Sequence, residues 1–330
     1  MLMYKRFYGL QKNPFEITPD PSFLFPTRKH DEALAALYYG VKRRKGVVVM
    51  TGEVGTGKTL MVRCLLQILG QARVAYAYIF NPRLTPIEFL QYIAGDLQLP
   101  IAGKSKTEFL LTLSSYVIGR YQKGLTTVLV IDEAHHLSTE VLEEIRLLSN
   151  LETAQAKLLQ ILLVGQPELD EKLDGTNLRQ LKQRIALRAN LSTLDLNETC
   201  DYIYRRLRLA GHANPAQLFP VETVLEVYQQ SRGLPRLINT LCENALIHGY
   251  ARQLPGISPE IIEGIGRDFR LKVEHPSTAE RTMDGERSSE VELAARTLLH
   301  LYEHLRRERD SGEDLRVTVG AGARKNEPYI

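Results

Sequence analysis

The most constraining feature of this sequence is a glycine-rich loop between a run of valines and an amphipathic segment. From Gly52 to Thr59 the chain reads GEVGTGKT, which matches the pattern G-x-x-x-x-G-K-[ST] at every fixed position. The valines predict a buried strand, and the spacing of the apolar residues after the loop predicts a helix. A strand, loop and helix in this order are typical of a phosphate-binding loop, because backbone N–H groups and a helix N-terminus together bind an anion.

The residues of this loop predict how a nucleotide would be held. We expect Lys58 to reach the β- and γ-phosphates of ATP, and the Thr59 hydroxyl to bind the Mg²⁺ that bridges them. A glycine-rich turn with an unrelated surface lysine is the alternative, and the predicted strand and helix on either side argue against it. The expected nucleotide contacts are Gly52, Glu53, Val54, Gly55, Thr56, Gly57, Lys58, Thr59 and Leu60.

A second motif places two acidic residues directly after an apolar run. The stretch VLVIDEAHHL predicts an apolar strand that delivers Asp132 and Glu133 to the carboxyl edge of the sheet, where α/β proteins bind ligands. We expect Asp132 to hold Mg²⁺ and Glu133 to orient the attacking water, the alternative being two acids that only cap a strand. His135 and His136 are adjacent, so their rings point in different directions, and no third ligand is spaced to join them. We therefore expect solvent-facing or supporting roles for them, not a metal site.

Further polar residues follow later strands and helices. Gln166 comes directly after an apolar strand, where an amide can sense the γ-phosphate or the attacking water; a turn-forming glutamine is the alternative. Arg179, Arg184 and Arg188 are candidates for an arginine supplied to a neighbouring subunit, although most helix arginines are only solvated surface. Arg236 opens a helix of the second domain, from which it could reach back to the nucleotide.

The order of the predicted elements indicates the fold class. Strands alternate with helices as far as residue 194, which predicts a parallel sheet with helices on both faces. Two of these helices, over 85–99 and 106–124, each open with a threonine that could cap them, Thr85 and Thr107. From residue 195 only helical patterns remain. We expect an N-terminal segment that wraps over another surface (1–28), an αβα core (29–194), an all-helical domain (195–269), and a polar linker, amphipathic helix and disordered tail (270–330).

Composition excludes several classes of protein. The 330 residues carry a net charge of +3, which is too small to argue for nucleic acid or a membrane surface. The three cysteines lie far apart, which favours reduced thiols over a metal site. No apolar run approaches the roughly 18 residues that a membrane span needs, and the N-terminus lacks a signal pattern. We expect a cytoplasmic protein that a partner could recruit to the inner membrane.

The motifs in their order resemble those of a known family. YGLQKNPFEITPDPSFLF, HDEALAALYYGV, GEVGTGKT, VLVIDEAHHL, LLVGQPEL, LKQRI and GLPRLIN are similar to the AAA+ ATPases of the general-secretion-pathway A type. The resemblance runs from about Tyr4 to Phe269. It implies an αβα P-loop ATPase core, a helical lid and a site at the junction of neighbouring subunits in a ring or other oligomer.

The resemblance also implies roles for individual residues. The loop from Gly52 to Thr59 would be Walker A, and Asp132 with Glu133 would be Walker B. Gln166 would be sensor 1, Arg184 the arginine finger and Arg236 sensor 2. The N-terminal region around Phe15 and His30 would lie near the adenine.

Three functions remain open at the level of sequence. The first is an ATPase that drives or regulates the assembly of an envelope export system. Long family members continue into a membrane span and a periplasmic domain. Because this sequence holds neither, we expect no direct contact with the cell wall. The second is a DNA-bound ATPase regulator of the transposition type, which shares the same core. The third is a slow nucleotide switch, in which ATP closes the lid with little turnover.

Overall fold

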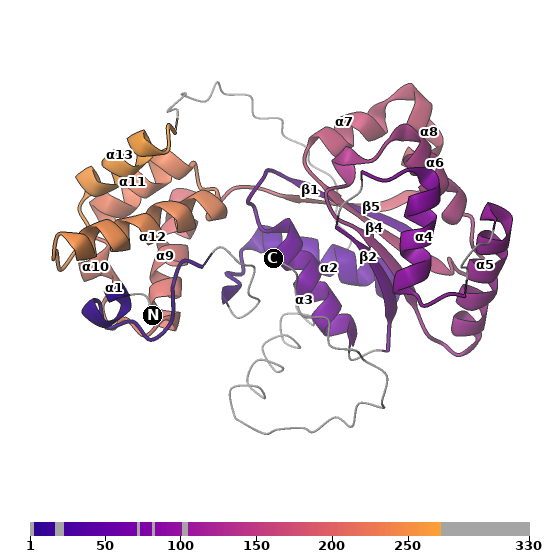
Figure 1. Ribbon diagram of the computed structural model, residues 1–330, viewed down its shortest axis with the longest axis horizontal. Coiled ribbons are helices and arrows are strands. Elements are labelled where there is room, and N and C mark those ends of the chain that lie inside the picture. The colour runs from indigo at the N-terminus through magenta and orange to yellow at the C-terminus, as the bar shows by residue number, and fades with distance from the viewer. Residues whose placement is uncertain (1–2, 17–22, 71–72, 81–82, 101–104, 272–330) are drawn as a thin grey trace.

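The core of the protein is a five-stranded parallel sheet (Figure 1). The structure is a computed structural model that describes residues 3–16, 23–70, 73–80, 83–100 and 105–271. The strands lie in the order β2-β3-β4-β1-β5, and all neighbours are parallel. Their bounds are β1 Val47–Gly52, β2 Ala75–Ile79, β3 Thr127–Ile131, β4 Leu159–Gly165 and β5 Ile185–Leu191. The predicted parallel α/β sheet is therefore confirmed.

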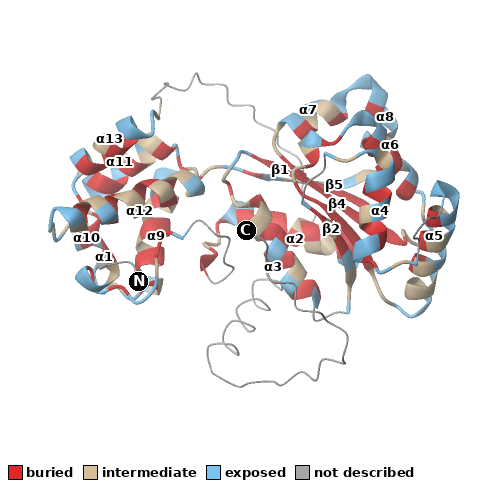
Figure 2. Cartoon of the chain, in the orientation of Figure 1, coloured by how far each residue is buried: buried red, intermediate tan, exposed pale blue. Residues whose placement is uncertain are grey.

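Helices cover both faces of this sheet. On one face α2 (Arg28–Lys42) and α3 (Lys58–Gly70) pack with Val48 and Met50 of β1, whereas Val47 and Val49 point to the other face. Every residue of β1, β3 and β4 is buried, because both faces are covered (Figure 2). The second face carries α4 Pro86–Asp96, α5 Lys106–Gln122, α6 Thr139–Leu148, α7 Glu168–Asp174 and α8 Arg179–Lys182, with the short 3₁₀ helices η2 Ala134–His136 and η3 Thr176–Leu178.

Helices α4 and α5 both begin at capping boxes. Thr85 caps α4 as predicted, and its hydroxyl accepts a hydrogen bond from the Glu88 N–H. The prediction for α5 was wrong, because its cap is Ser105 and not Thr107. The Ser105 N–H in turn donates a hydrogen bond to Glu108 Oε2 over 2.8 Å. A serine followed three residues later by a glutamate satisfies two free N–H groups at once, and Thr107, already inside the helix, cannot do so.

The second domain is an all-helical lid in the residues that the structure describes. The N-terminal helix α1 (Met3–Phe7) packs against it (Figure 1). Tyr4, Tyr8 and Phe15 are buried in the same apolar cluster as the lid helices, so the N-terminal segment covers the lid. The lid helices are α9 Leu196–Leu209, α10 Pro215–Leu218, α11 Val221–Ser231, α12 Pro235–Ala251 and α13 Pro259–Asp268.

The joint between core and lid requires one glycine. The chain leaves β5 and enters α9 through a short connection, and the predicted boundary between residues 194 and 195 falls in it. Gly233 has φ +71°, and its carbonyl accepts a hydrogen bond from the Leu194 N–H over 2.9 Å. A Cβ on Gly233 would lie 1.9 Å from the Leu194 carbonyl oxygen. Only a residue without a side chain lets the lid approach the connection this closely.

The last described residue is Leu271, three residues after the end of α13. The predicted polar linker, the amphipathic helix over 291–310 and the tail lie outside the described residues. Within the described ranges, no helix combines the length and apolar character that crossing a bilayer requires.

Candidate nucleotide-binding site

The loop between β1 and α3 has the backbone of a phosphate-binding loop. Gly55 has φ +86° and Gly57 has φ +100°, in the left-handed region where a side chain is strained. Helix α3 begins immediately afterwards at Lys58. The free N–H groups of its first turn and the loop therefore face the same space.

Lys58 lies folded against this loop. Its Nζ donates hydrogen bonds to the carbonyl oxygens of Gly52, over 2.7 Å, and of Glu53, over 2.9 Å. Burial lowers the pKa of Lys58, and the nearby carboxylates of Glu133 and Asp132 oppose that shift. The ammonium group is thus held at the loop by bonds that an arriving phosphate can replace.

Asp132 and Thr59 meet beside the loop. The Thr59 hydroxyl donates to Asp132 Oδ2 over 2.9 Å, although 73 residues separate them in sequence. The Tyr78 hydroxyl donates to the same oxygen over 2.8 Å, and the Glu133 N–H donates to Oδ1 over 3.0 Å. Burial, followed by the charge of Asp132, raises the pKa of the Tyr78 phenol. Tyr78 was missed from the sequence, because nothing in AYAYI distinguishes it from Tyr76.

These donors fit Mg²⁺ bound together with a nucleotide. One carboxylate and one hydroxyl are hard oxygen ligands, and Mg²⁺ is typically held by one or two such groups plus phosphate oxygens and waters. Within the described residues no group of three or more His, Cys, Asp or Glu side chains could hold a metal ion. The arrangement therefore suits an ion that arrives with phosphate.

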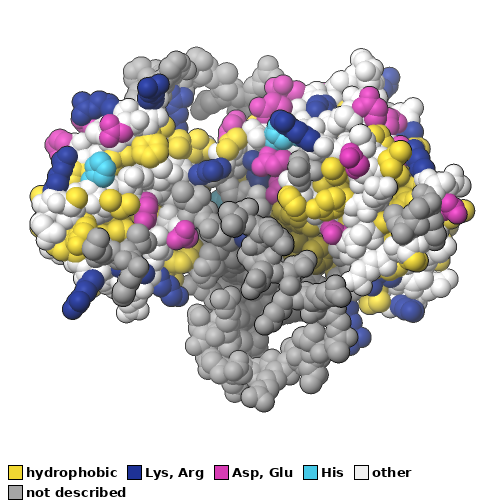
Figure 3. Space-filling model, in the orientation of Figure 1, with side chains coloured by type: hydrophobic (Ala, Val, Ile, Leu, Met, Phe, Trp, Pro, Cys, Tyr) yellow, Lys and Arg dark blue, Asp and Glu magenta, His cyan; other side chains and the backbone are white. Residues whose placement is uncertain are grey.

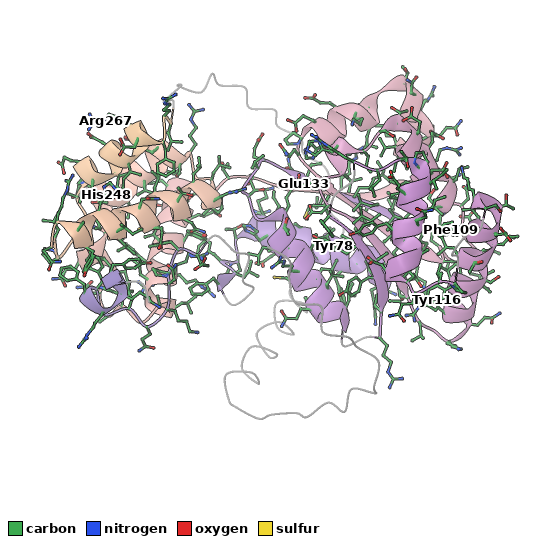
Figure 4. The ribbon with its side chains drawn as sticks, in the orientation of Figure 1. Tyr78, Phe109, Tyr116, Glu133, His248 and Arg267 are labelled. Atoms are coloured by element: carbon green, nitrogen blue, oxygen red, sulfur yellow. The ribbon has the colours of Figure 1, made fainter. Side chains whose placement is uncertain are left out.

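Glu133 follows β3 in an unusual backbone conformation. Its φ is +53°, which is uncommon for a residue with a side chain and occurs often at functional sites. Its Oε2 is buried without a hydrogen bond and lies 3.5 Å from His135 Nδ1. Figure 4 shows Glu133 and Tyr78 on the side of the core that faces the lid.

Gln166 lies next to His135, at the end of β4. The two side chains approach over 2.9 Å between the Gln166 amide nitrogen and His135 Nε2. Lys172 donates to the carbonyl oxygens of His135 and Leu137, which fixes the backbone of η2. His136 is exposed, but its ring centroid lies 4.0 Å from that of His135, so the prediction that the two rings point in different directions was wrong.

A cavity of about 430 Å³ lies between the loop and the lid. Arg236, at the start of α12, lines it, and its backbone N–H donates to the Gly55 carbonyl over 3.3 Å. A Cβ on Gly55 would lie 2.7 Å from the Arg236 Cβ, so this glycine is also needed for the lid to approach. The core residues that line the cavity are Val54, Gly55, Gly57, Lys58, Thr59, Leu60 and Glu133.

The far wall of the cavity comes from residues that the sequence did not single out for the site. Glu16, Tyr202, Arg206 and Asn239 line it. Arg206 is buried; its Nη1 donates to the Tyr202 hydroxyl over 2.9 Å, and that hydroxyl donates to Asn239 Oδ1 over 2.9 Å. Arg206 also donates to the backbone carbonyls of Pro14 and Glu16, which ties the N-terminal segment to the lid. In sequence, Arg206 is only one arginine of a basic helix.

Phe15 and His30 have supporting positions, and neither lines the cavity. Phe15 is fully buried in the lid, in an edge contact with Phe219. His30 is buried under the phosphate loop, with Nε2 3.3 Å from the Thr56 carbonyl and Nδ1 2.7 Å from the Thr27 hydroxyl. Burial lowers the pKa of His30.

The three candidate arginines differ in their surroundings. Arg188 lies within β5 and forms an ion pair with Asp170 of its own chain. Arg179 is exposed at the start of α8. Arg184 directly precedes β5, whose first residue pairs with Val47, so Arg184 lies at the amino edge of the sheet. The phosphate loop follows the other end of β1, so Arg184 is roughly the length of a strand away from its own loop.

Comparisons with known proteins agree with this geometry. A family model described as an AAA domain matches residues 41–173. General secretion pathway protein A of Aeromonas hydrophila is 43% identical over 251 residues, which cover 76% of this chain and 45% of that protein. The chain thus spans less than half the length of this curated relative.

Among solved structures, similar folds occur in ORC and Cdc6 proteins. The ORC2 protein of Aeropyrum pernix has a TM-score of 0.59 at 19% identity, covering 78% of this chain and 72% of that one. Cdc6p from Pyrobaculum aerophilum has a TM-score of 0.58 at 20% identity, covering 76% and 71%. Drosophila ORC bound to DNA has a TM-score of 0.58 at 18% identity, covering 78% and 65%. At these identities the likeness shows the fold alone.

Proposed function

This chain belongs to the AAA proteins of the general secretion pathway A type, and on that premise we propose that it binds ATP with Mg²⁺ and hydrolyses it. The observation that carries the proposal is the convergence of three elements on one cavity. The phosphate loop, Glu133 after β3 and the start of α12 all line it, and Thr59, which also lines it, contacts Asp132 directly.

Binding is assigned to the loop and to both walls of the cavity. The N–H groups of the loop and of the first turn of α3 would bind the phosphates, and Lys58 would leave the carbonyls of Gly52 and Glu53 to reach the β- and γ-phosphates. Thr59 and Asp132 would hold Mg²⁺. When bound there, Mg²⁺ would supply positive charge that offsets the negative charge developing on the phosphates. Arg236 would contact the phosphates from the lid.

Hydrolysis is assigned to Glu133 and Gln166. Glu133 would orient a water whose oxygen attacks the γ-phosphorus while the bond to the bridging oxygen breaks, giving ADP and phosphate. Gln166, at the end of the neighbouring strand, would sense the γ-phosphate or that water. Arg184 is too far from its own loop to take part there, so we assign it to the site of an adjoining subunit.

The biological role follows from the family. We assign the ATPase to the assembly or regulation of a bacterial envelope secretion system, with a protein of that system as partner. Because lid and core both line the nucleotide cavity, binding and hydrolysis would move the lid relative to the core, and that movement would act on the partner.

Two substitutions test the enzymatic part of the proposal. Lys58→Ala is expected to abolish ATP binding, since it removes the charge at the phosphates. Glu133→Gln is expected to keep binding and to lower the hydrolysis rate by about 100-fold or more, because the amide cannot act as a base. Binding is measured with a fluorescent ATP analogue and hydrolysis by phosphate release. Wild-type turnover by Glu133→Gln would refute the role of Glu133.

A DNA-bound regulator is the second candidate, and one solved relative by fold is Drosophila ORC bound to DNA. On the face drawn in Figure 3, acidic and basic side chains of the described residues are interspersed, which gives no reason to prefer it. The ATPase rate is measured with and without double-stranded DNA at two salt concentrations. Strong, salt-sensitive stimulation would favour the DNA-bound regulator, and a rate indifferent to DNA would favour the secretion role. Hydrolysis by the wild-type protein no faster than the rate without protein would favour a slow switch.

A further inference from the structure

Three polar side chains form a chain across the ends of two neighbouring strands. Glu133 follows β3, His135 lies in η2 two residues later, and Gln166 follows β4. The Gln166 amide nitrogen lies 2.9 Å from His135 Nε2, and Glu133 Oε2 lies 3.5 Å from His135 Nδ1. The imidazole ring thus stands between the two groups that the proposed function places around the attacking water.

The distances favour one tautomer of His135. If the ring proton lies on Nδ1, then Nε2 accepts from the Gln166 amide and Nδ1–H points at Glu133 Oε2. That carboxylate oxygen is buried and has no other hydrogen-bond partner in the described structure. The other tautomer would use the longer contact, 3.4 Å from the Gln166 backbone N–H to Nδ1, and would turn a lone pair toward the carboxylate. Because an unpaired buried carboxylate oxygen is costly, the Nδ1–H form accounts for more of the geometry.

The surroundings of His135 hold the ring in place. The His135 side chain is 7% exposed, and Lys172 fixes its backbone through the carbonyl oxygens of residues 135 and 137. Burial lowers the pKa of His135, and His136 and Lys58 lower it further, against the opposing charges of Glu133 and Glu168. The ring is therefore neutral near pH 7, which is the state in which one nitrogen donates and the other accepts.

We propose that His135 is a positioning residue that joins Gln166 to Glu133 through opposite nitrogens of its ring. His135 binds Glu133 Oε2. The rest of the Glu133 side chain, which is 42% exposed, then faces the cavity and the attacking water. If Gln166 moves on contact with the γ-phosphate, the rigid imidazole ring of His135 would transmit that movement to Glu133. The inference rests on the proposed function, because it assigns His135 a task in the same hydrolysis.

Kinetics of substituted proteins test the proposal. His135→Ala is expected to lower kcat by about 10- to 100-fold, as removing a partner that orients a catalytic group does, with KM and the melting temperature unchanged. His135→Asn keeps a donor near the position of Nδ1 and is expected to recover part of the loss. His248→Ala is the matched control, since His248 lies in the lid helix α12 and does not line the cavity, and it is expected to behave like wild type.

A double-mutant cycle separates coupling from independent effects. Gln166→Leu removes the amide that contacts Nε2. If the ring connects the two residues, His135→Ala combined with Gln166→Leu is no slower than the slower single variant. Fold losses in rate that multiply, or a His135→Ala variant as active as His248→Ala, would overturn the proposal. A loss of melting temperature together with a raised KM would also overturn it, in favour of a structural role.

A spectroscopic readout keeps the inference separate from the proposed function. In protein labelled with ¹⁵N-histidine, the ring shifts of His135, identified by their loss in His135→Asn, report which nitrogen carries the proton. The expected result is the Nδ1–H form, with an Nε2 shift that changes in Gln166→Leu. An Nε2–H form, or shifts indifferent to Gln166→Leu, would overturn the inference. Failure of the proposed function would show differently, as ATP hydrolysis by the wild-type protein no faster than the rate without protein.

Discussion

At the scale of single residues, the site depends on how Asp132 is held. Asp132 accepts hydrogen bonds from the Thr59 hydroxyl, the Tyr78 hydroxyl and the Glu133 N–H. It is buried, so each bond replaces one that water would otherwise make. The Thr59 hydroxyl can keep donating its hydrogen bond to Asp132 while the lone pairs of its oxygen face a metal ion. In the proposed function, Asp132 and Thr59 would therefore be preorganised for Mg²⁺, and Tyr78 would support that arrangement from β2.

Tyr78→Phe tests this support. The substitution removes one hydrogen bond to Asp132 and leaves the ring in place, so we expect the Mg²⁺ affinity of the nucleotide complex to fall by about tenfold. It is measured by titrating Mg²⁺ into protein with a fluorescent ATP analogue. Tyr76→Phe, in the same strand and 45% exposed, is the control. Equal Mg²⁺ affinities for the two variants would contradict a role for Tyr78 at the metal.

At the scale of elements, strand ends and helix starts bring the site together, and glycines set how closely they approach. The carboxyl ends of β1, β3 and β4 deliver the phosphate loop, the two acids and Gln166 to one edge. From the lid, α12 approaches Gly55, and Gly233 lets the lid turn closely against the connection at Leu194. The lid thus comes close to the phosphate loop at Gly55 and to the connection at Leu194, two points where no side chain fits.

Gly233→Ala tests the joint. Its Cβ would overlap the Leu194 carbonyl oxygen, and its φ of +71° is strained for alanine, so we expect a loss of at least about 2 kcal/mol in the free energy of unfolding. Urea denaturation measures the change. Gly264→Ala in α13 is the control, because no atom lies within 4 Å of its added Cβ, and alanine there is expected to stabilise by up to about 1 kcal/mol. Similar stabilities for the two variants would contradict the close approach.

Much of the core and half of the site could be predicted because their signals are local in sequence. The phosphate loop and the acids after β3 are contiguous motifs, and alternating strands and helices predict a parallel sheet. Tyr78 could not be recognised, because only the pairing of β2 with β3 brings it beside Asp132. Arg206 and Glu16 could not either, since an interaction over 190 residues of sequence joins them. Such contacts follow from tertiary packing, which periodicity does not reveal.

At the scale of the whole molecule, one chain would provide most of the proposed ATPase site but not its arginine. In the proposed function, the cavity between core and lid supplies Lys58 for phosphate, Thr59 for the metal and Glu133 for the attacking water. Of the three candidate arginines, Arg188 is engaged with Asp170, and Arg184 lies at the opposite edge of the sheet from its own loop. An arginine at that edge can complete only the site of a second copy, as it would in a head-to-tail ring. This is the basis for proposing a self-assembling ATPase.

The measurement that tests this account most directly is ATP hydrolysis by an equimolar mixture of two inactive variants. Lys58→Ala cannot bind ATP, and Arg184→Ala is expected to bind it without hydrolysis. In a mixed assembly half of the sites keep Lys58, and half of those adjoin an intact Arg184, so we predict about a quarter of the wild-type rate. A mixture no faster than its inactive parents, or an Arg184→Ala variant as fast as wild type, would contradict a site completed by the neighbouring subunit.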